Sequence, residues 1–125
     1  MKVQLALAGA FAAGVLTLAL SAGPAAAQSC DQHNRTIAVI NGGASTITYV
    51  QATNSTRSDW GDDLLGESTV IASGNYVAVN PEDCSGQCSF DFLVTYEGGQ
   101  QVETYGVNVC QASQLACTEA SCSWQ

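Results

Sequence analysis

The chain has 125 residues, and three basic against eleven acidic residues give it a formal charge of −8 at neutral pH. Only two basic residues, Arg35 and Arg57, lie beyond position 2, so residues 28–125 alone carry a formal charge of −9. This balance excludes the basic surface that nucleic-acid binding requires, and it argues against binding to anionic membranes. The acidity promotes solubility by itself and is compatible with cationic partners or Ca²⁺.

Residues 1–27 have the three-part pattern of a secretory signal peptide. A lysine at position 2 precedes an apolar run over residues 3–20, and a Gly-Pro pair then leads into three alanines that end at Ala27. This cleavage signal favours removal of the segment over its retention as a membrane-spanning helix. Lipidation of Cys30 is a further alternative, although the residues before this cysteine fit a lipidation signal poorly.

Cleavage after Ala27 predicts one exported domain, residues 28–125, with a modest hydrophobic core. We expect it in the periplasm or outside the cell, without a transmembrane segment. All six cysteines lie in this part of the chain, and an even number in a small exported protein predicts three disulfides. They are Cys30, Cys84, Cys88, Cys110, Cys117 and Cys122.

Short runs of β-branched and aromatic residues, separated by turn residues, predict strands, and no amphipathic helix is found. The runs at 36–40 and 46–50 flank an Asn-Gly-Gly turn, which predicts a hairpin. The runs at 69–71 and 76–79 flank a tight Ser-Gly-Asn turn. Together with the runs that follow, this pattern predicts an all-β fold, a small antiparallel β-sandwich of six or seven strands held by disulfides.

The clearest predicted element is a hairpin that begins near residue 89. Apolar residues at alternate positions from Phe90 to Tyr96 share one face of their strand, because side chains alternate with a period of two. Gly98-Gly99 predicts a two-residue turn, since glycine accepts positive φ without steric cost. The return strand is predicted over residues 101–109.

In the register that this turn sets, Phe92 faces Tyr105, and a bulge at Gly106 brings Cys88 opposite Cys110. Even without the bulge, both cysteines lie at the open end of the hairpin, which predicts the disulfide Cys88–Cys110. The sequence leaves open the pairing of Cys30, Cys84, Cys117 and Cys122.

One alternative for Cys84, Cys88, Cys117 and Cys122 is a zinc site with four thiolate ligands. A four-thiolate zinc site would need the usual two-residue spacing of zinc knuckles, which is absent, and thiols in an oxidising compartment pair with each other first. Residues 111–125 show little periodicity and are expected to form an irregular segment held by cysteines.

An acidic loop, residues 54–68, contains the stretch RSDWGDDLLGES. One interpretation is a capped turn in which the aspartates accept backbone N–H groups while Trp60, Leu64 and Leu65 plug the end of the sandwich. The other is a Ca²⁺ site that takes its oxygen ligands from the loop, although the spacing differs from that of an EF-hand. The candidate ligands are Asp59, Asp62, Asp63 and Glu67.

Three motifs carry a family resemblance: WGDDLLG at 60–66, CSFDFLVTYEGG at 88–99 and VNVC at 107–110. With a glycine turn at Gly74 between them, they resemble an uncharacterised family of small exported bacterial β-rich proteins. That family has a WGxDxLG loop and a C-x-[FY]-D strand. The resemblance spans about residues 36–110 and implies export and a compact β fold, but no activity. Four of the six cysteines depart from the family's shorter pattern.

No motif for catalysis is found. A Ser-His-Asp triad would have to use His33, the only histidine, and no Gly-x-Ser-x-Gly elbow occurs. We therefore expect a secreted or periplasmic, non-enzymatic binding or structural module without a cofactor, whose ligand the sequence does not identify. The alternatives are a Ca²⁺-binding β module that uses the Asp59–Glu67 segment and, last, a small hydrolase.

Overall fold

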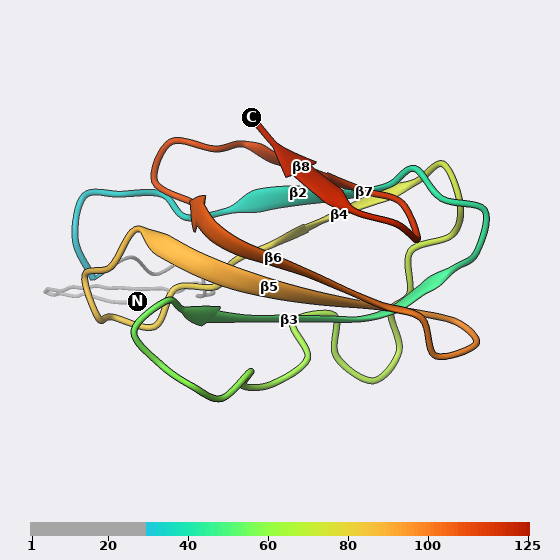
Figure 1. Cartoon of the computed structure of the whole chain (residues 1–125). Coiled ribbons are helices and arrows are strands. Elements are labelled where there is room, and N and C mark those ends of the chain that lie inside the picture. The colour runs from blue at the N-terminus through green and yellow to red at the C-terminus, as the bar shows by residue number, and fades with distance from the viewer. Residues whose placement is uncertain (1–29) are drawn as a thin grey trace, which may run out of the picture.

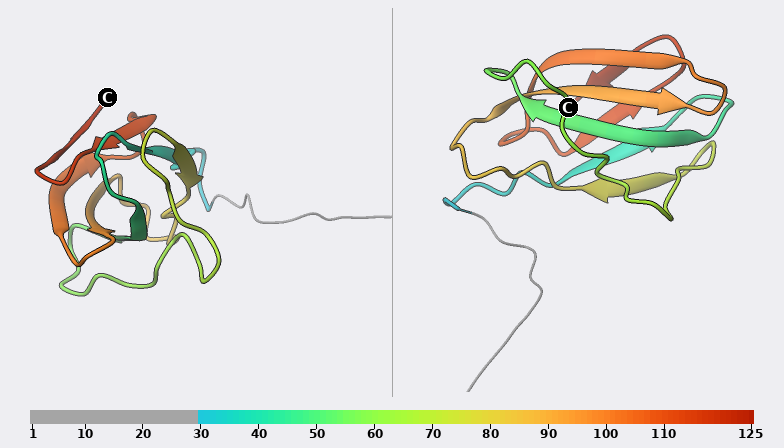
Figure 2. Two further views of the ribbon diagram at one scale, coloured as in Figure 1. Left: turned by 90° about the vertical axis from the view of Figure 1, so that its right-hand side faces the viewer. Right: turned by 90° about the horizontal axis from the view of Figure 1, so that it is seen from below.

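The computed structural model describes residues 30–125, which form two β-sheets packed face to face (Figures 1 and 2). One sheet has four strands in the order β4-β2-β7-β8, and the other has three in the order β3-β5-β6. The strands are β2 (Ile37–Asn41), β3 (Ile47–Asn54), β4 (Tyr76–Val79), β5 (Ser89–Tyr96), β6 (Gln101–Asn108), β7 (Gln114–Cys117) and β8 (Cys122–Trp124). The predicted all-β sandwich is confirmed.

The described residues contain no helix, and therefore none of the length and apolarity needed to cross a bilayer. The predicted signal peptide, residues 1–27, lies outside the described part of the chain. Between the sheets, inward-facing apolar residues of β2 to β7 form the core, as a sandwich requires. On β5 the alternate apolar residues from Phe90 to Tyr96 are almost completely buried, as the period of two predicts.

The predicted hairpin between the first two strands is wrong, because β2 and β3 belong to different sheets. Asn41, at the end of β2, is buried and directs the chain across the sandwich. Its side-chain amide donates to the carbonyl oxygens of Ser45 (2.7 Å) and Ile71 (2.9 Å). Its Oδ1 accepts the N–H of Gly43 (2.9 Å) and the hydroxyl of Tyr96 (3.2 Å). Burial raises the pKa of Tyr96 to about 12, so the hydroxyl keeps the proton that it donates.

β2 finds its partners elsewhere in the sequence. It pairs antiparallel with β4 on one side and parallel with β7 on the other. The tail therefore forms two strands, β7 and β8, where the sequence predicted an irregular segment. A tail strand completes the sheet because Leu115 of β7 is apolar and fully buried against the core.

The predicted strand at 69–71 is reduced to one bridge, between Ile71 and Ile47. The tight turn that follows is present, closed by the N–H of Asn75 on the carbonyl oxygen of Ala72 (3.0 Å). The chain before it runs along the free edge of β3 and covers the backbone groups of that edge. Covering an edge in this way protects a sheet from pairing with another chain.

The β5–β6 hairpin is present with one difference near its turn. The loop holds three residues in place of two, because the N–H of Tyr96 bonds the carbonyl oxygen of Gln100 (2.8 Å). Phe92 consequently faces Thr104, where the predicted register placed Tyr105. A bulge at Gly106, where φ is +70°, adds one residue, so that Phe90 faces Val107 beyond it. Because the longer turn and the bulge compensate each other, Cys88 lies opposite Val109, whose N–H bonds its carbonyl oxygen (2.8 Å), and not opposite Cys110 as predicted.

All six cysteines form disulfides, namely Cys30–Cys84, Cys88–Cys110 and Cys117–Cys122. No thiolate is left for a zinc site, and the sulfur of Cys30 is not free to carry a lipid. The Cys88–Cys110 bond joins the two chain segments at the open end of the β5–β6 hairpin. Three disulfides in a domain of this size indicate an oxidising environment, extracellular or periplasmic.

Candidate functional site

The acidic loop lies against the outer face of the three-stranded sheet, below β3 in Figure 1. The side-chain amide of Gln51 holds it there by donating to the carbonyl oxygen of Gly61 (2.9 Å). Gln51 is the cross-strand partner of Leu93, which lies between the buried Phe92 and Val94 and points to the outer face. Leu93 is nevertheless only 6% exposed, so the centre of this face is covered.

Asp63 anchors the loop to the free edge of β3. Its Oδ1 accepts the backbone N–H groups of Val50 (3.0 Å) and Leu65 (3.1 Å). Leu65 is part of the buried core, and Leu64 is half-buried against it. The carboxylate therefore caps backbone donors while the adjacent leucines fill the margin of the core beside β3.

Trp60 lies apart from these leucines. It is half-buried, does not belong to the core cluster, and packs on the ring of Tyr105 with centroids 6.2 Å apart and planes inclined by 39°. Gly61, with a φ of +76°, redirects the chain between the tryptophan and the leucines, which favours glycine at this position. The three residues expected to form one plug thus divide between the core margin and the outer face.

The four candidate Ca²⁺ ligands have separate roles. Asp59 pairs with Arg57 at 2.9 Å, and the hydrogen bond from Arg57 lowers the pKa of Asp59. Asp63 caps the backbone, as described above, while Asp62 and Glu67 are exposed. A Ca²⁺ ion needs six to eight oxygen ligands around one point.

Within residues 30–125, potential metal ligands meet in threes at two places only. Both groups contain disulfide-bonded cysteines, and neither contains a carboxylate of the acidic loop. The Ca²⁺ interpretation gains no support from this arrangement and stays a prediction.

Two hollows border the acidic loop. The larger, of about 480 Å³, is lined by Thr48, Tyr49, Asp63, Gly66, Glu67, Thr69 and Val70. The smaller, of about 240 Å³, is lined by Thr53, Arg57, Ser58, Asp59, Trp60, Asp91, Glu103 and Tyr105. We call the smaller one the aromatic hollow; its residues come from the loop, β3, β5 and β6, the face seen from below in Figure 2.

The β-bulge of β6 shapes the aromatic hollow. Because the bulge interrupts the ladder opposite Asp91, the N–H of Gly106 donates to Oδ1 of this aspartate instead (3.0 Å). The hydroxyl of Ser55 donates to the same oxygen (2.7 Å). Bulges commonly re-aim side chains beside functional sites, and here the bulge holds a carboxylate at the hollow.

Tyr105 and Glu103 line the aromatic hollow from β6. Tyr105 is 62% exposed, and its hydroxyl donates to Oε1 of Glu103. This hydrogen bond raises the pKa of Tyr105, so the phenol stays neutral at physiological pH. Within residues 30–125, the bonds to Asp91 and Glu103 engage one oxygen of each carboxylate and leave the other oxygen available.

The larger hollow offers fewer groups for recognition. Asp63 uses its carboxylate on the backbone, which leaves Glu67 as the only other ionised side chain in the lining. The aromatic hollow combines two rings with three carboxylates and one guanidinium. Ligand sites typically join aromatic surface to a few convergent polar groups, so we take the aromatic hollow as the candidate site despite its smaller volume.

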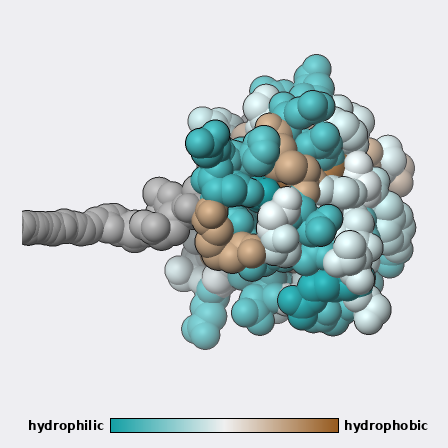
Figure 3. Space-filling model, turned by 90° about the vertical axis from the view of Figure 1, so that its left-hand side faces the viewer, coloured by the Kyte–Doolittle hydropathy of each residue, from teal (hydrophilic) through white to brown (hydrophobic). Residues whose placement is uncertain are grey.

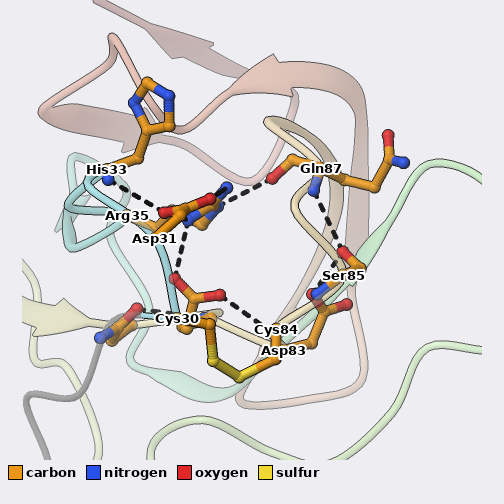
Figure 4. Close-up of a disulfide and its surroundings, with 10 residues drawn as sticks. Cys30, Asp31, His33, Arg35, Asp83, Cys84, Ser85 and Gln87 are labelled. Carbon is orange, nitrogen blue, oxygen red and sulfur yellow. Dashed lines mark hydrogen bonds and ion pairs between the residues drawn. A yellow bond between two sulfur atoms is a disulfide. The ribbon is translucent and has the colours of Figure 1, made fainter.

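Sequence reasoning considered only the loop and missed the contributions of Asp91, Glu103 and Tyr105. A signal was present, because outward positions on two paired strands carry these residues, and Tyr105 immediately precedes a glycine that predicts a bulge. It also missed Arg35, whose guanidinium is buried at the end of the sandwich near the Cys30–Cys84 bond (Figure 4).

Arg35 is enclosed by acceptors from two segments. It donates to both carboxylate oxygens of Asp31 (2.9 and 3.0 Å), to Oε1 of Glu82 (2.8 Å) and to the carbonyl oxygen of Gln87 (2.8 Å). Mainly because of the hydrogen bonds from Arg35, the pKa of Asp31 falls far below its usual range. The surface at this end is mixed and largely hydrophilic (Figure 3), and the contacts of Arg35 are those of a structural cluster.

His33 lies near this cluster. A nitrogen of its imidazole lies within 4.8 Å of the sulfur atoms of Cys88 and Cys110, and both sulfurs are engaged in a disulfide. Its backbone N–H, not its ring, makes the 2.9 Å bond to Asp31. The histidine on which a hydrolase would depend therefore packs beside a disulfide.

Comparison with models of protein families finds no match, and comparisons with curated proteins and with solved structures find no significant match either. The resemblance to the small exported proteins with a WGxDxLG loop accordingly stays a prediction, and the function must be argued from the site.

Proposed function

We propose that the protein is an exported, non-enzymatic binding module and that its ligand site is the aromatic hollow. The observation that carries this proposal is the pairing of Trp60 with the exposed ring of Tyr105 beside two carboxylates that each keep an available oxygen. Such a combination gives a ligand an apolar surface and directional acceptors at the same time.

Export is part of the proposal. Residues 1–27 have the pattern of a cleaved signal peptide, and the three disulfides agree with maturation in an oxidising compartment. The absence of an enzymatic role is also proposed, because the one histidine adjoins a disulfide and the sequence lacks a nucleophile elbow.

Tryptophan fluorescence offers a direct test. The chain has two tryptophans, so Trp124→Phe leaves Trp60 as the only reporter. We would titrate this variant with one cationic, one neutral and one anionic probe: choline, maltotriose and glucuronate. The proposal predicts a saturable change in Trp60 emission with one of them.

Two further variants show whether the change in Trp60 emission comes from the aromatic hollow. Tyr105→Ala should abolish it, while Tyr76→Ala, which removes an equally exposed tyrosine from β4 of the other sheet, should not. A response that survives Tyr105→Ala, or no saturable response to any of the three probes, would overturn the proposed site.

A further inference from the structure

We infer that the aromatic hollow binds an organic ammonium group, an inference that rests on the proposed function and specifies its ligand. The lining carries Asp59, Asp91 and Glu103 against the single cation Arg57. Arg57 is already paired with Asp59 through two hydrogen bonds of 3.0 and 2.9 Å. The excess negative charge of the hollow therefore resides on Asp91 and Glu103.

No cation in the described part of the chain is available to neutralise these two carboxylates. The other guanidinium among residues 30–125 belongs to Arg35, which is buried and bonded to Asp31 and Glu82. Asp91 and Glu103 lie on adjacent strands, β5 and β6, and both line one hollow. A ligand with a positive charge would supply the missing partner.

The rings define what kind of cation fits. An ammonium group over the face of an indole or phenol ring is attracted by the negative face of the π-system, and tryptophan is the most favourable partner. The rings of Trp60 and Tyr105, inclined by 39° to each other, both line the hollow together with the two carboxylates. A metal ion needs oxygen ligands around one point, and neither of the groups of three potential metal ligands within residues 30–125 includes a carboxylate of the hollow.

The negative charge of the whole domain also favours the binding of a cation. Residues 28–125 carry a formal charge of −9, which raises the local concentration of cations and accelerates their association. This attraction weakens as salt shortens the Debye length. Binding of an ammonium ligand should therefore depend on ionic strength, whereas binding of a neutral saccharide to the same rings should not.

The test compares choline with its uncharged isostere, in which a carbon atom replaces the ammonium nitrogen. Both are titrated into the Trp124→Phe variant, with Trp60 emission as the readout. We expect choline to bind at least about tenfold more tightly than the isostere, and to lose affinity several-fold between about 20 mM and about 200 mM NaCl.

Two variants that each remove one negative charge distinguish an effect of the aromatic hollow from an effect of the overall acidity of the domain. Glu103→Gln should weaken choline binding about fivefold to tenfold, while Glu97→Gln, the same change at the exposed β5–β6 turn, should have little effect. Equal effects of the two variants, or equal binding of choline and its isostere, would overturn the ammonium inference.

The outcomes distinguish the two proposals. If maltotriose binds without salt dependence and choline does not bind, the ammonium inference is wrong while the aromatic hollow remains a binding site. If no probe changes the emission of Trp60, the inference and the proposed function fail together.

Discussion

Replacing Arg35 by methionine tests whether the buried ion cluster holds the end of the sandwich together. The guanidinium has no solvent-exposed surface, and the side chain of Glu82, one of its acceptors, is 9% exposed. Arg35→Met keeps most of the side-chain volume but removes the donor to Oε1 of Glu82 and to the carbonyl oxygen of Gln87. Oε2 of Glu82 keeps the N–H of Cys84 (2.9 Å), but the charge of Glu82 loses its counter-ion. Asp31 is more exposed and regains water more easily.

Removing one partner of a buried ion pair typically costs about 3–5 kcal/mol, because the other charge stays buried without compensation. Since Asp31 can be hydrated, we expect the lower end, about 3 kcal/mol. For a domain of this size, that loss lowers Tm by about 12–24 °C. It is a large share of the roughly 5–15 kcal/mol by which a domain is stable.

The assay is urea unfolding of the oxidised protein, followed by tryptophan fluorescence and by circular dichroism. The chain contains its own control, because Arg57→Met makes the same change at an exposed ion pair whose side chains are 55% and 58% exposed. Exposed pairs contribute about 0–1 kcal/mol. Equal losses in the two variants, or a loss below about 1 kcal/mol for Arg35→Met, would refute the reasoning.

The pH dependence gives a second readout of the same cluster. Arg35 holds the pKa of Asp31 below its ordinary value of about 4. A carboxyl whose pKa is lowered by folding stabilises the fold at pH values above its unfolded pKa, and this contribution is lost as the pH falls below about 4. Arg35→Met should therefore flatten the decline in stability between about pH 4 and pH 2.

Three further predictions concern the rest of the molecule. Asn41→Ala leaves several buried partners unsatisfied and should cost about 3 kcal/mol in urea unfolding, against about 1 kcal/mol for Tyr96→Phe, which removes one bond. Each disulfide can be removed singly by replacing both of its cysteines with alanine. The free energy of unfolding should fall by about 4 kcal/mol for Cys30–Cys84, about 3 for Cys88–Cys110 and about 2 for Cys117–Cys122, because these bonds span 54, 22 and 5 residues. The reverse order would contradict the explanation by chain entropy. Mass spectrometry of exported protein should find a chain that begins at Gln28; an intact Met1 would rule out cleavage.

Features set by neighbouring residues could be predicted from the sequence. The period of two from Phe90 to Tyr96 identified the buried face of β5, because strand geometry alone fixes which side chains share a face. A glycine at position 106 indicated the bulge, since positive φ is accessible there. The turn was shifted by one residue, because two adjacent glycines permit either a two-residue or a three-residue loop.

Features set by distant residues could not be predicted. An Asn-Gly-Gly sequence after a strand is typical of a hairpin, yet Asn41 is buried and bonds groups as remote as Tyr96. Alternation indicates which residues face the core, but not that β2 lies beside β7 in parallel. In the same way, the sequence does not identify Glu82 as a partner of Arg35, because the two residues are 47 positions apart.

The candidate site illustrates why a run of acidic residues misleads. Asp59, Asp62 and Asp63 are close in sequence, but a tight loop directs their side chains to different places, and each has a separate environment. Asp91 and Glu103 are 12 residues apart and meet through strand pairing at the same hollow. Sheet faces gather residues that the linear sequence separates.

The acidity of the domain and its disulfides are connected. A formal charge of −9 on a domain of this size destabilises the compact state by self-repulsion, and the modest core of a small domain offers little reserve. Both arginines of residues 30–125 are engaged by carboxylates, so they relieve repulsion only locally. Three disulfides offset this cost, since each restricts the unfolded chain whatever the charge of the folded surface. An oxidising environment, in which the disulfides persist, thus permits an acidic surface, and that surface supplies the field by which the aromatic hollow would attract an ammonium ligand.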